Sequence, residues 1–144
     1  MLESIHFLRK EIISALSGQI TINGNSVDVY NRIPTSANYP LIRVYSVSSN
    51  EIDQNQSSFI METITRIECI SRFSSDDGGE LQVNQMVYQI LNIVRSRPQP
   101  FDLSSYGFKV FTSVNDGVKY LDDDMKDHTY YRGIIELSNK VQQI

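Results

Sequence analysis

The chain has 144 residues, of which 40% are hydrophobic and 21% charged, a composition typical of an ordinary folded domain and far from disordered or collagen-like sequences. Its formal net charge of -4 opposes nonspecific adhesion to nucleic acid, because phosphate binding depends on concentrated Lys and Arg. No apolar run approaches the roughly 20 residues of a membrane-spanning helix, the N-terminus lacks the basic flank and apolar run of a signal peptide, and the single cysteine, Cys69, excludes an internal disulfide.

The first predicted element is an amphipathic helix over residues 2–16. Its apolar side chains, among them Ile5, Leu8 and Ile12, recur at the three-and-four spacing of one helix face, and Gly18 is suited to end it. Residues 19–30 then alternate apolar and polar side chains around Asn23-Gly24, a dipeptide that favours the positive backbone dihedrals of a tight turn. A short hairpin is therefore expected after the helix.

Two long strands are predicted next, over residues 41–52 and 59–73. They follow an irregular connection marked by Pro34 and Pro40, are rich in Ile, Val and Thr, and are joined by a polar tip at residues 53–58. We expect them to form an antiparallel hairpin.

The second of these strands has two faces of different character. Alternation predicts that one face points to the core, and this face carries Thr65, Ile67, Cys69 and Phe73. The opposite face mixes ionic side chains with isoleucines, which indicates a surface covered by another subunit. Its members are Arg66, Glu68 and Arg72, with Ile64 and Ile70.

A central helix is predicted over residues 80–97. One side of it is broadly apolar, with Val83, Val87, Ile90, Leu91 and Val94 widened by Met86 and Ile93. Asp77, followed three residues later by Glu80, predicts a capping box at its start. Arg95 and Arg97 suit the negative end of the helix dipole.

Two closing strands are predicted to pair, over residues 106–114 and 129–138. The first is expected to place Phe108, Val110, Thr112 and Val114 on one face and to end at a bend over residues 115–117. Residues 118–128 then predict an acidic, turn-rich connection, and residues 139–144 a short polar tail. Together the elements predict a single α+β domain over residues 1–144, in which an antiparallel or mixed sheet of long hairpins packs against one central helix and an N-terminal helix.

The strongest candidate for chemistry is an acidic cluster at residues 122–128. Carboxylates and imidazole bind divalent metals, and the cluster contains Asp122, Asp123, Asp124, Asp127 and His128. A helix-loop-helix calcium site would instead need alternating ligands, a central glycine and a terminal Glu. We therefore expect a solvated hairpin tip and no metal site, with metal-dependent hydrolysis as an alternative.

The other catalytic candidates have simpler structural interpretations. Cys69 lies in an alternating strand with no protease or hydrolase signature near it, which predicts a buried, inert thiol instead of a nucleophile assisted by His6 or His128. Asp77-Gly78-Gly79 is glycine-rich at a helix start, but two acids there would repel a phosphate. We expect no catalytic residue, no cofactor and no enzyme activity.

Three stretches of the chain carry a family resemblance. They are Tyr39-Pro40-Leu41-Ile42-Arg43-Val44, the strand Arg66-Ile67-Glu68-Cys69-Ile70-Ser71-Arg72-Phe73 running into residues 74–80, and Asp116-Gly117 with the acidic loop and the strand over residues 130–138. With this order of elements, the chain from about residue 33 onward resembles the tail-completion, or tail terminator, family of long-tailed bacteriophages. Phe73 and Gly79 keep the family's bulky aromatic after the second long strand and its glycine at the helix start, whereas the tip at residues 53–58 and the aspartate-rich loop are less typical.

The resemblance implies a structural virion protein, made in the host cytoplasm, that forms a ring of six copies at the head-proximal end of the tail tube. Its partners would be the tail tube protein and a head-tail connector or neck protein, and DNA would pass through the lumen without specific binding. No membrane partner is implied. The alternatives are another tail tube or neck/connector subunit, or a small metal-dependent hydrolase using residues 122–128. We place the assembly interface at Asp53, Gln54, Asn55, Gln56, Asp122, Asp123, Asp124 and Lys126.

Overall fold

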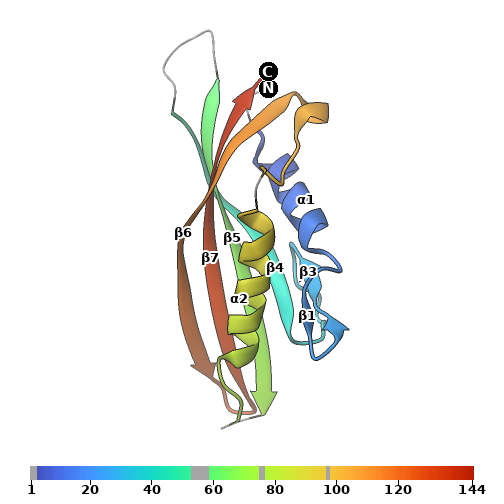
Figure 1. Ribbon diagram of the computed structural model, residues 1–144. Coiled ribbons are helices and arrows are strands. Elements are labelled where there is room, and N and C mark those ends of the chain that lie inside the picture. The colour runs from blue at the N-terminus through green and yellow to red at the C-terminus, as the bar shows by residue number, and fades with distance from the viewer. Residues whose placement is uncertain (1–2, 53–58, 75–76, 97) are drawn as a thin grey trace.

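The computed structural model describes residues 3–52, 59–74, 77–96 and 98–144. Two helices, α1 (Ile5–Leu16) and α2 (Leu81–Val94), lie on one side of a five-stranded sheet with the order β3-β4-β5-β7-β6 (Figure 1). The sheet strands are β3 (Asp28–Tyr30), β4 (Leu41–Glu51), β5 (Ile60–Ser74), β6 (Phe108–Asp124) and β7 (His128–Gln143). β3 pairs with β4 in parallel and the other neighbours are antiparallel, so the predicted α+β fold with a mixed sheet is confirmed.

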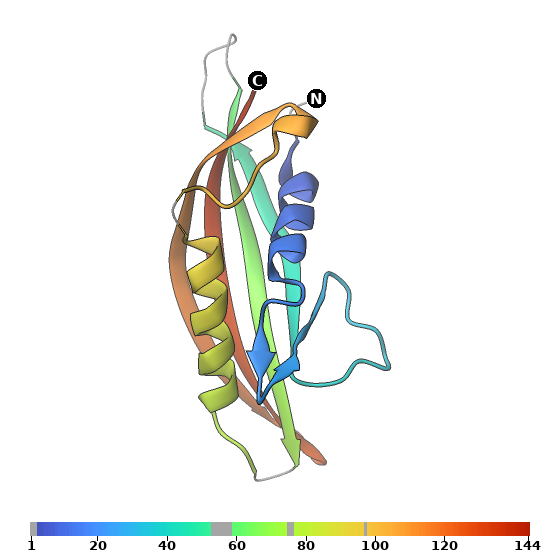
Figure 2. The same cartoon turned by 45° about the vertical axis from the view of Figure 1, so that its right-hand side comes forward.

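The core lies between the two helices and the sheet, and both views show the helices on the same face (Figures 1 and 2). A single hydrophobic cluster joins the buried stripes of α1 and α2 to the inward side chains of the strands. Thr65, Ile67 and Cys69 are fully buried on this side, which confirms the predicted core face of β5. Apolar periodicity alone was enough to place both helices.

The predicted short hairpin is also confirmed. β1 (Thr21–Ile22) pairs with β2 (Asn25–Ser26) across a turn in which Asn23 has φ 52° and Gly24 has φ 80°. A turn with positive φ at both central residues matches the twist of two antiparallel strands. Gln89 of α2 holds this hairpin, since its side-chain amide donates to the carbonyl of Thr21 and accepts from the Thr21 N–H, at 2.8 and 2.9 Å.

The predicted capping box at α2 is wrong. The helix begins at Leu81, Glu80 makes no side-chain capping bond, and Asp77 accepts a hydrogen bond from the adjacent Gly78 N–H at 2.8 Å. Gly78 has φ +91° and turns the chain before the helix starts, so Asp77 stays outside it. At the other end, Arg95 follows the last turn and donates to the carbonyl of Ser113 instead of capping the helix, and Arg97 lies outside the described residues.

The predicted bend at residues 115–117 and the loop at 118–128 are wrong, because β6 continues through them to Asp124. β-Bulges interrupt its pairing with β7 between Val110 and Thr112 and between Asn115 and Gly117. At the second bulge Asn115 accepts a hydrogen bond from the Gly117 N–H at 3.0 Å, and Gly117 has φ +140°. An extra residue is absorbed there and the strand resumes.

The first bulge also overturns the face predicted for β6. Phe108 and Val110 are buried, but the bulge reverses the alternation, so Thr112 and Val114 are exposed and Ser113 points inward. The predicted tail at residues 139–144 is wrong as well, because β7 runs to Gln143 in the middle of the sheet with Asn139 and Val141 fully buried. The pairing of β7 with both β5 and β6 stabilises a strand whose sequence looks polar.

Candidate assembly surface

The two faces of the sheet differ in what covers them. Both helices pack on one face, and the opposite face, here called the open face, has no helix over it among the described residues (Figures 1 and 2). It carries the outward side chains of β4, β5 and β7, including those predicted from alternation in β5: Ile64, Arg66, Glu68, Ile70 and Arg72. The prediction that these five residues share a face opposite the core is confirmed.

Ion pairs cross the strands on the open face. Arg132 of β7 contacts Glu68 of β5 at 3.3 Å and Asp123 of β6 at 3.0 Å, and Arg66 contacts Glu136 at 3.5 Å. The Glu68 side chain is only 9% exposed, so Arg132 neutralises a nearly buried carboxylate. Contact with Tyr45 and then with the Glu136 carboxylate raises the pKa of Arg66.

Arginines and tyrosines stack on the same face. The Arg43 guanidinium lies 4.5 Å from the ring centre of Tyr45, and that of Arg72 lies 4.5 Å from the ring centre of Tyr39. Tyr39 in turn meets Tyr130 edge to face at 5.8 Å. Because stacking occupies the flat side of a guanidinium, its N–H groups can still bind carboxylates.

Apolar side chains are interspersed with these charges. Leu41 and Ile70 are cross-strand partners on the open face and are 0% and 2% exposed, although they lie outside the main core cluster. Ile64 and Ile134 are half-buried on the same face. Arg and Tyr around apolar side chains is a composition enriched at protein interfaces.

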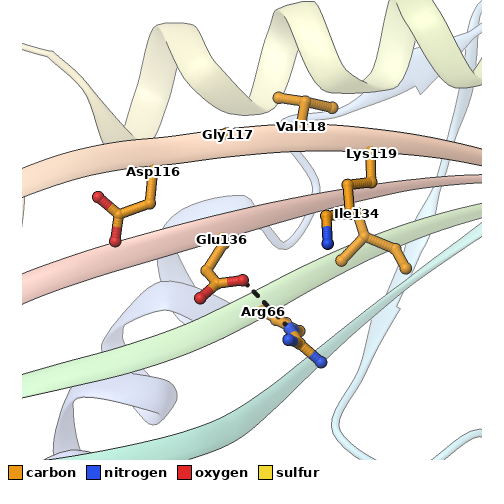
Figure 3. Close-up of a pocket in the computed structure, with 7 residues that line it drawn as sticks. All are labelled: Arg66, Asp116, Gly117, Val118, Lys119, Ile134 and Glu136. Atoms are coloured by element: carbon orange, nitrogen blue, oxygen red, sulfur yellow. Dashed lines mark ion pairs between the residues drawn. The ribbon is translucent and has the colours of Figure 1, made fainter.

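A shallow hollow of about 380 Å³ lies where β6 bulges. Figure 3 shows Val118 pointing towards α2, whereas Lys119 and Ile134 point to the other side, near the Arg66–Glu136 pair. Asp116 adds a further carboxylate to the lining. The hollow is thus lined by positively charged, negatively charged and apolar side chains, a mixture that suits contact with the side chains of a protein partner.

The edge strand β6 is long and exposes several apolar side chains. It has 17 residues and pairs only with β7 in the described sheet. Phe111 and Val114 are each 45% exposed, and Leu121 is 50% exposed. Edge strands of this kind are templates for pairing with another chain.

The hairpin tip between β6 and β7 contains four of the predicted interface residues. Asp123 points to the open face and binds Arg132, whereas Asp122 and Asp124 alternate to the other side, where Asp124 accepts a hydrogen bond from the Thr129 hydroxyl at 2.9 Å. Lys126 is exposed in the turn. The described residues contain no group of three His, Cys, Asp or Glu side chains that could hold a metal ion.

The other predicted interface residues, Asp53, Gln54, Asn55 and Gln56, lie outside the described residues. The strand ends that flank them belong to the opposite end of the sheet, because Ile60 pairs with Gln142 while Ser74 pairs with His128 beside the hairpin tip. The described start of β5 and the hairpin tip therefore lie at different ends of the sheet.

The prediction of a buried thiol is confirmed. Cys69 is fully buried, and burial, with a smaller effect from Glu68, raises the pKa of its thiol. His6 packs on Phe7 in α1, with ring centres 3.9 Å apart, and His128 pairs with Ser74 at the end of β5. In the strand register Cys69 pairs with Gly133, whereas His128 pairs with Ser74 at the end of the strand.

Sequence reasoning did not find a second hollow, of about 390 Å³, that two arginines line. Arg32 and Arg43 line it with Asn31 and Ile33, and Asn31 is fixed by donating to the Val44 carbonyl at 2.8 Å. The sequence signal was the alternation of Arg43 with Tyr45, but only the fold brings Arg32 next to them.

No protein-family model matches the chain, and comparison with curated proteins gave no match. Among the described residues, no helix has the length and apolar character required to cross a membrane.

Proposed function

We propose that the protein is a tail terminator, whose copies form a closed ring at the head-proximal end of a phage tail tube. The observation that carries the proposal is the open face, where stacked arginines and tyrosines and cross-strand ion pairs surround buried Leu41 and Ile70 without a covering helix. Such a face suits a protein partner better than a small substrate. The family resemblance of the sequence supplies the identity of the assembly.

The sheet offers edges suited to head-to-tail contacts between copies. β6 is one edge, and at the other edge β3 pairs only with Leu41, Ile42 and Arg43, although β4 continues to Glu51. Two different edges can meet in a heterologous interface, which closes into a ring when the rotation between copies allows it. Closure of the ring would stop the addition of further copies.

The charge of the chain supports a role beside DNA. A net charge of -4 per copy gives a ring an acidic excess, which weakens phosphate binding and suits passage of DNA through a lumen. One end of the ring would bind the tail tube protein and the other a head-tail connector or neck protein. A tube or neck subunit is the alternative assignment within the same structural class.

The test is addition of the purified protein to growing tail tubes, followed by negative-stain microscopy and native mass measurement. We expect closed rings at one tube end and tubes that no longer lengthen. A monomer in isolation is compatible with this, because the tube end can stabilise the ring by binding it. Filaments of the protein alone would favour a tube subunit, and tubes that grow unchanged would refute the proposal.

A matched pair of variants sharpens this test. Val114→Arg places a charge on the exposed edge strand and should abolish capping, whereas Ser105→Arg adds the same charge to an exposed residue of the short helix η1 (Ser104–Tyr106) and should not. Far-UV circular dichroism establishes that both variants are folded. Equal capping by both variants would exclude β6 from the contact.

A further inference from the structure

Three arginines, Arg32, Arg43 and Arg72, lie on or beside the open face. Arg43 and Arg72 are held over tyrosine rings, each at 4.5 Å, and Arg32 shares with Arg43 the hollow of about 390 Å³. Within the described residues, the ion pairs of the open face involve Arg66 and Arg132 and none of these three. We call Arg32, Arg43 and Arg72, with Tyr39 and Tyr45, the arginine face.

Stacking prepares Arg43 and Arg72 for carboxylates. A guanidinium that lies over a ring has lost part of its rotational freedom. Apart from the Arg43 Nε–H, which donates to the Asn31 carbonyl at 3.4 Å, the guanidinium N–H groups can bind carboxylates. The hollow beside Arg43 is lined by Asn31, whose amide is fixed on the Val44 carbonyl, and by Ile33. A carboxylate entering it would meet charge, hydrogen-bond donors and an apolar wall.

The chain itself carries matching carboxylates. Asp122 and Asp127 lie exposed at the end of the β6–β7 hairpin, and we call this pair the acid tip. Asp122 alternates to the helix side of the sheet, since its neighbour Asp123 is the residue that reaches Arg132 on the open face. The strand register thus directs Asp122 away from the arginine face of its own chain.

We propose that the acid tip of one copy docks on the arginine face of the next. The two surfaces differ, so the contact is heterologous and repeats around an axis, and every copy gives one tip and receives another. The inference rests on the proposed ring function, for which it names the two surfaces that meet. It also assigns a partner surface to the aspartates of the hairpin tip.

A second copy suits the arginine face better than nucleic acid does. Glu68, Glu136 and Asp123 lie on the open face among the arginines, so this face lacks the continuous positive charge that binding of a phosphate backbone needs. The chain as a whole is also acidic. A compact acidic hairpin can place its carboxylates on chosen arginines, whereas a phosphate strand would have to cross the acidic side chains.

The test uses reciprocal charge reversal in the full chain. The face variant is Arg32→Glu with Arg72→Glu, and the tip variant is Asp122→Arg with Asp127→Arg, which leaves the hydrogen-bonded Asp124 and the paired Asp123 untouched. The control variant, Glu11→Arg with Glu51→Arg, makes the same change in net charge as the tip variant, away from the hairpin tip. Circular dichroism confirms that each is folded before association is measured.

Sedimentation at about 0.01 M salt, where charges act over about 30 Å, should show self-association of the wild type and of the control variant. Each reversed variant alone should associate at least about tenfold more weakly. An equimolar mixture of face and tip variants should recover association as alternating copies, because each then meets a surface of opposite charge. Native mass measurement reports the alternation directly.

Three results would overturn the inference: a wild type that remains monomeric up to about 1 mM, variants that associate as the wild type does, or a mixture that fails to recover. Binding of duplex DNA that the face variant loses, without association of copies, would assign the arginine face to nucleic acid instead. If the protein caps tubes but the charge reversals do not alter association, the proposed function stands and the contact between the acid tip and the arginine face is refuted. Recovery in the mixture without tube capping would do the reverse.

Discussion

Gly78 offers a sharp test of how the chain turns from β5 into α2. It has φ +91°, a region that residues with a side chain rarely adopt. A Cβ added there would lie 2.3 Å from Cδ2 and 2.4 Å from Cγ of Phe73. Gly79 has no heavy atom within 4 Å of such a Cβ and no positive φ, so the neighbouring glycine is a matched control.

The cost of Gly78→Ala follows from these two observations. The unfavourable dihedral costs about 1–2 kcal/mol, and overpacking against Phe73 adds about 1–3 kcal/mol. The ring cannot move freely, because it packs edge to face on Tyr131 with centres 5.9 Å apart. Since alanine also restricts the unfolded chain, which returns about 0.4–1 kcal/mol, we expect the free energy of unfolding to fall by about 1–4.5 kcal/mol.

Urea unfolding followed by far-UV circular dichroism measures this, since the chain has no Trp. Gly79→Ala should change the free energy of unfolding by less than about 1 kcal/mol in either direction. In a Phe73→Ala background, Gly78→Ala should cost only the dihedral term, and the difference isolates the contact. Equal stabilities of the Gly78→Ala and Gly79→Ala proteins would refute this account of the turn.

Two further predictions concern the core. Burial raises the pKa of the Cys69 thiol in the folded protein, whereas in the unfolded chain the thiol keeps a pKa of about 8.5. The difference between the two states therefore stabilises the folded protein fully below about pH 8.5, and this stabilisation is lost as the pH rises. Above about pH 9.5, the free energy of unfolding should fall by a limiting value of about 1.4 kcal/mol per pH unit, and a Cys69→Ala protein without that slope would confirm the cause. Gly133→Ala would place a Cβ 2.6 Å from Cγ1 of Val83 and should lower the free energy of unfolding by about 1–3 kcal/mol. Adding Val83→Ala should recover at least about 1 kcal/mol of it in a double-mutant cycle, and simple additivity would contradict the packing.

Local patterns in the sequence were sufficient where the determining interactions are local. Asn23-Gly24 specifies its own turn, and the stripes of α1 and α2 follow from the period of a helix. The capping-box prediction was wrong because the chain turns at Gly78, which packs against Phe73, and the helix begins only at Leu81, beyond Asp77. Alternation likewise placed Arg66 and Glu68 on one face, but Glu136 and Arg132, which complete their ion pairs, come from β7, a strand distant in the chain.

The bulges of β6 explain why simple alternation does not predict its two faces, and they determine which side chains it exposes. Between them the alternation reverses, which buries Ser113, whose hydroxyl accepts from Asn139 at 2.6 Å and donates to Gln99 at 3.1 Å. This polar network stabilises the reversed register, and beyond the second bulge Val118 again packs on the core. The reversal leaves Val114, an apolar residue, 45% exposed on an edge strand, so that folding of one copy buries it only in part. Pairing with a second chain would bury it, so the bulged edge and the open face are consistent with the same account of assembly.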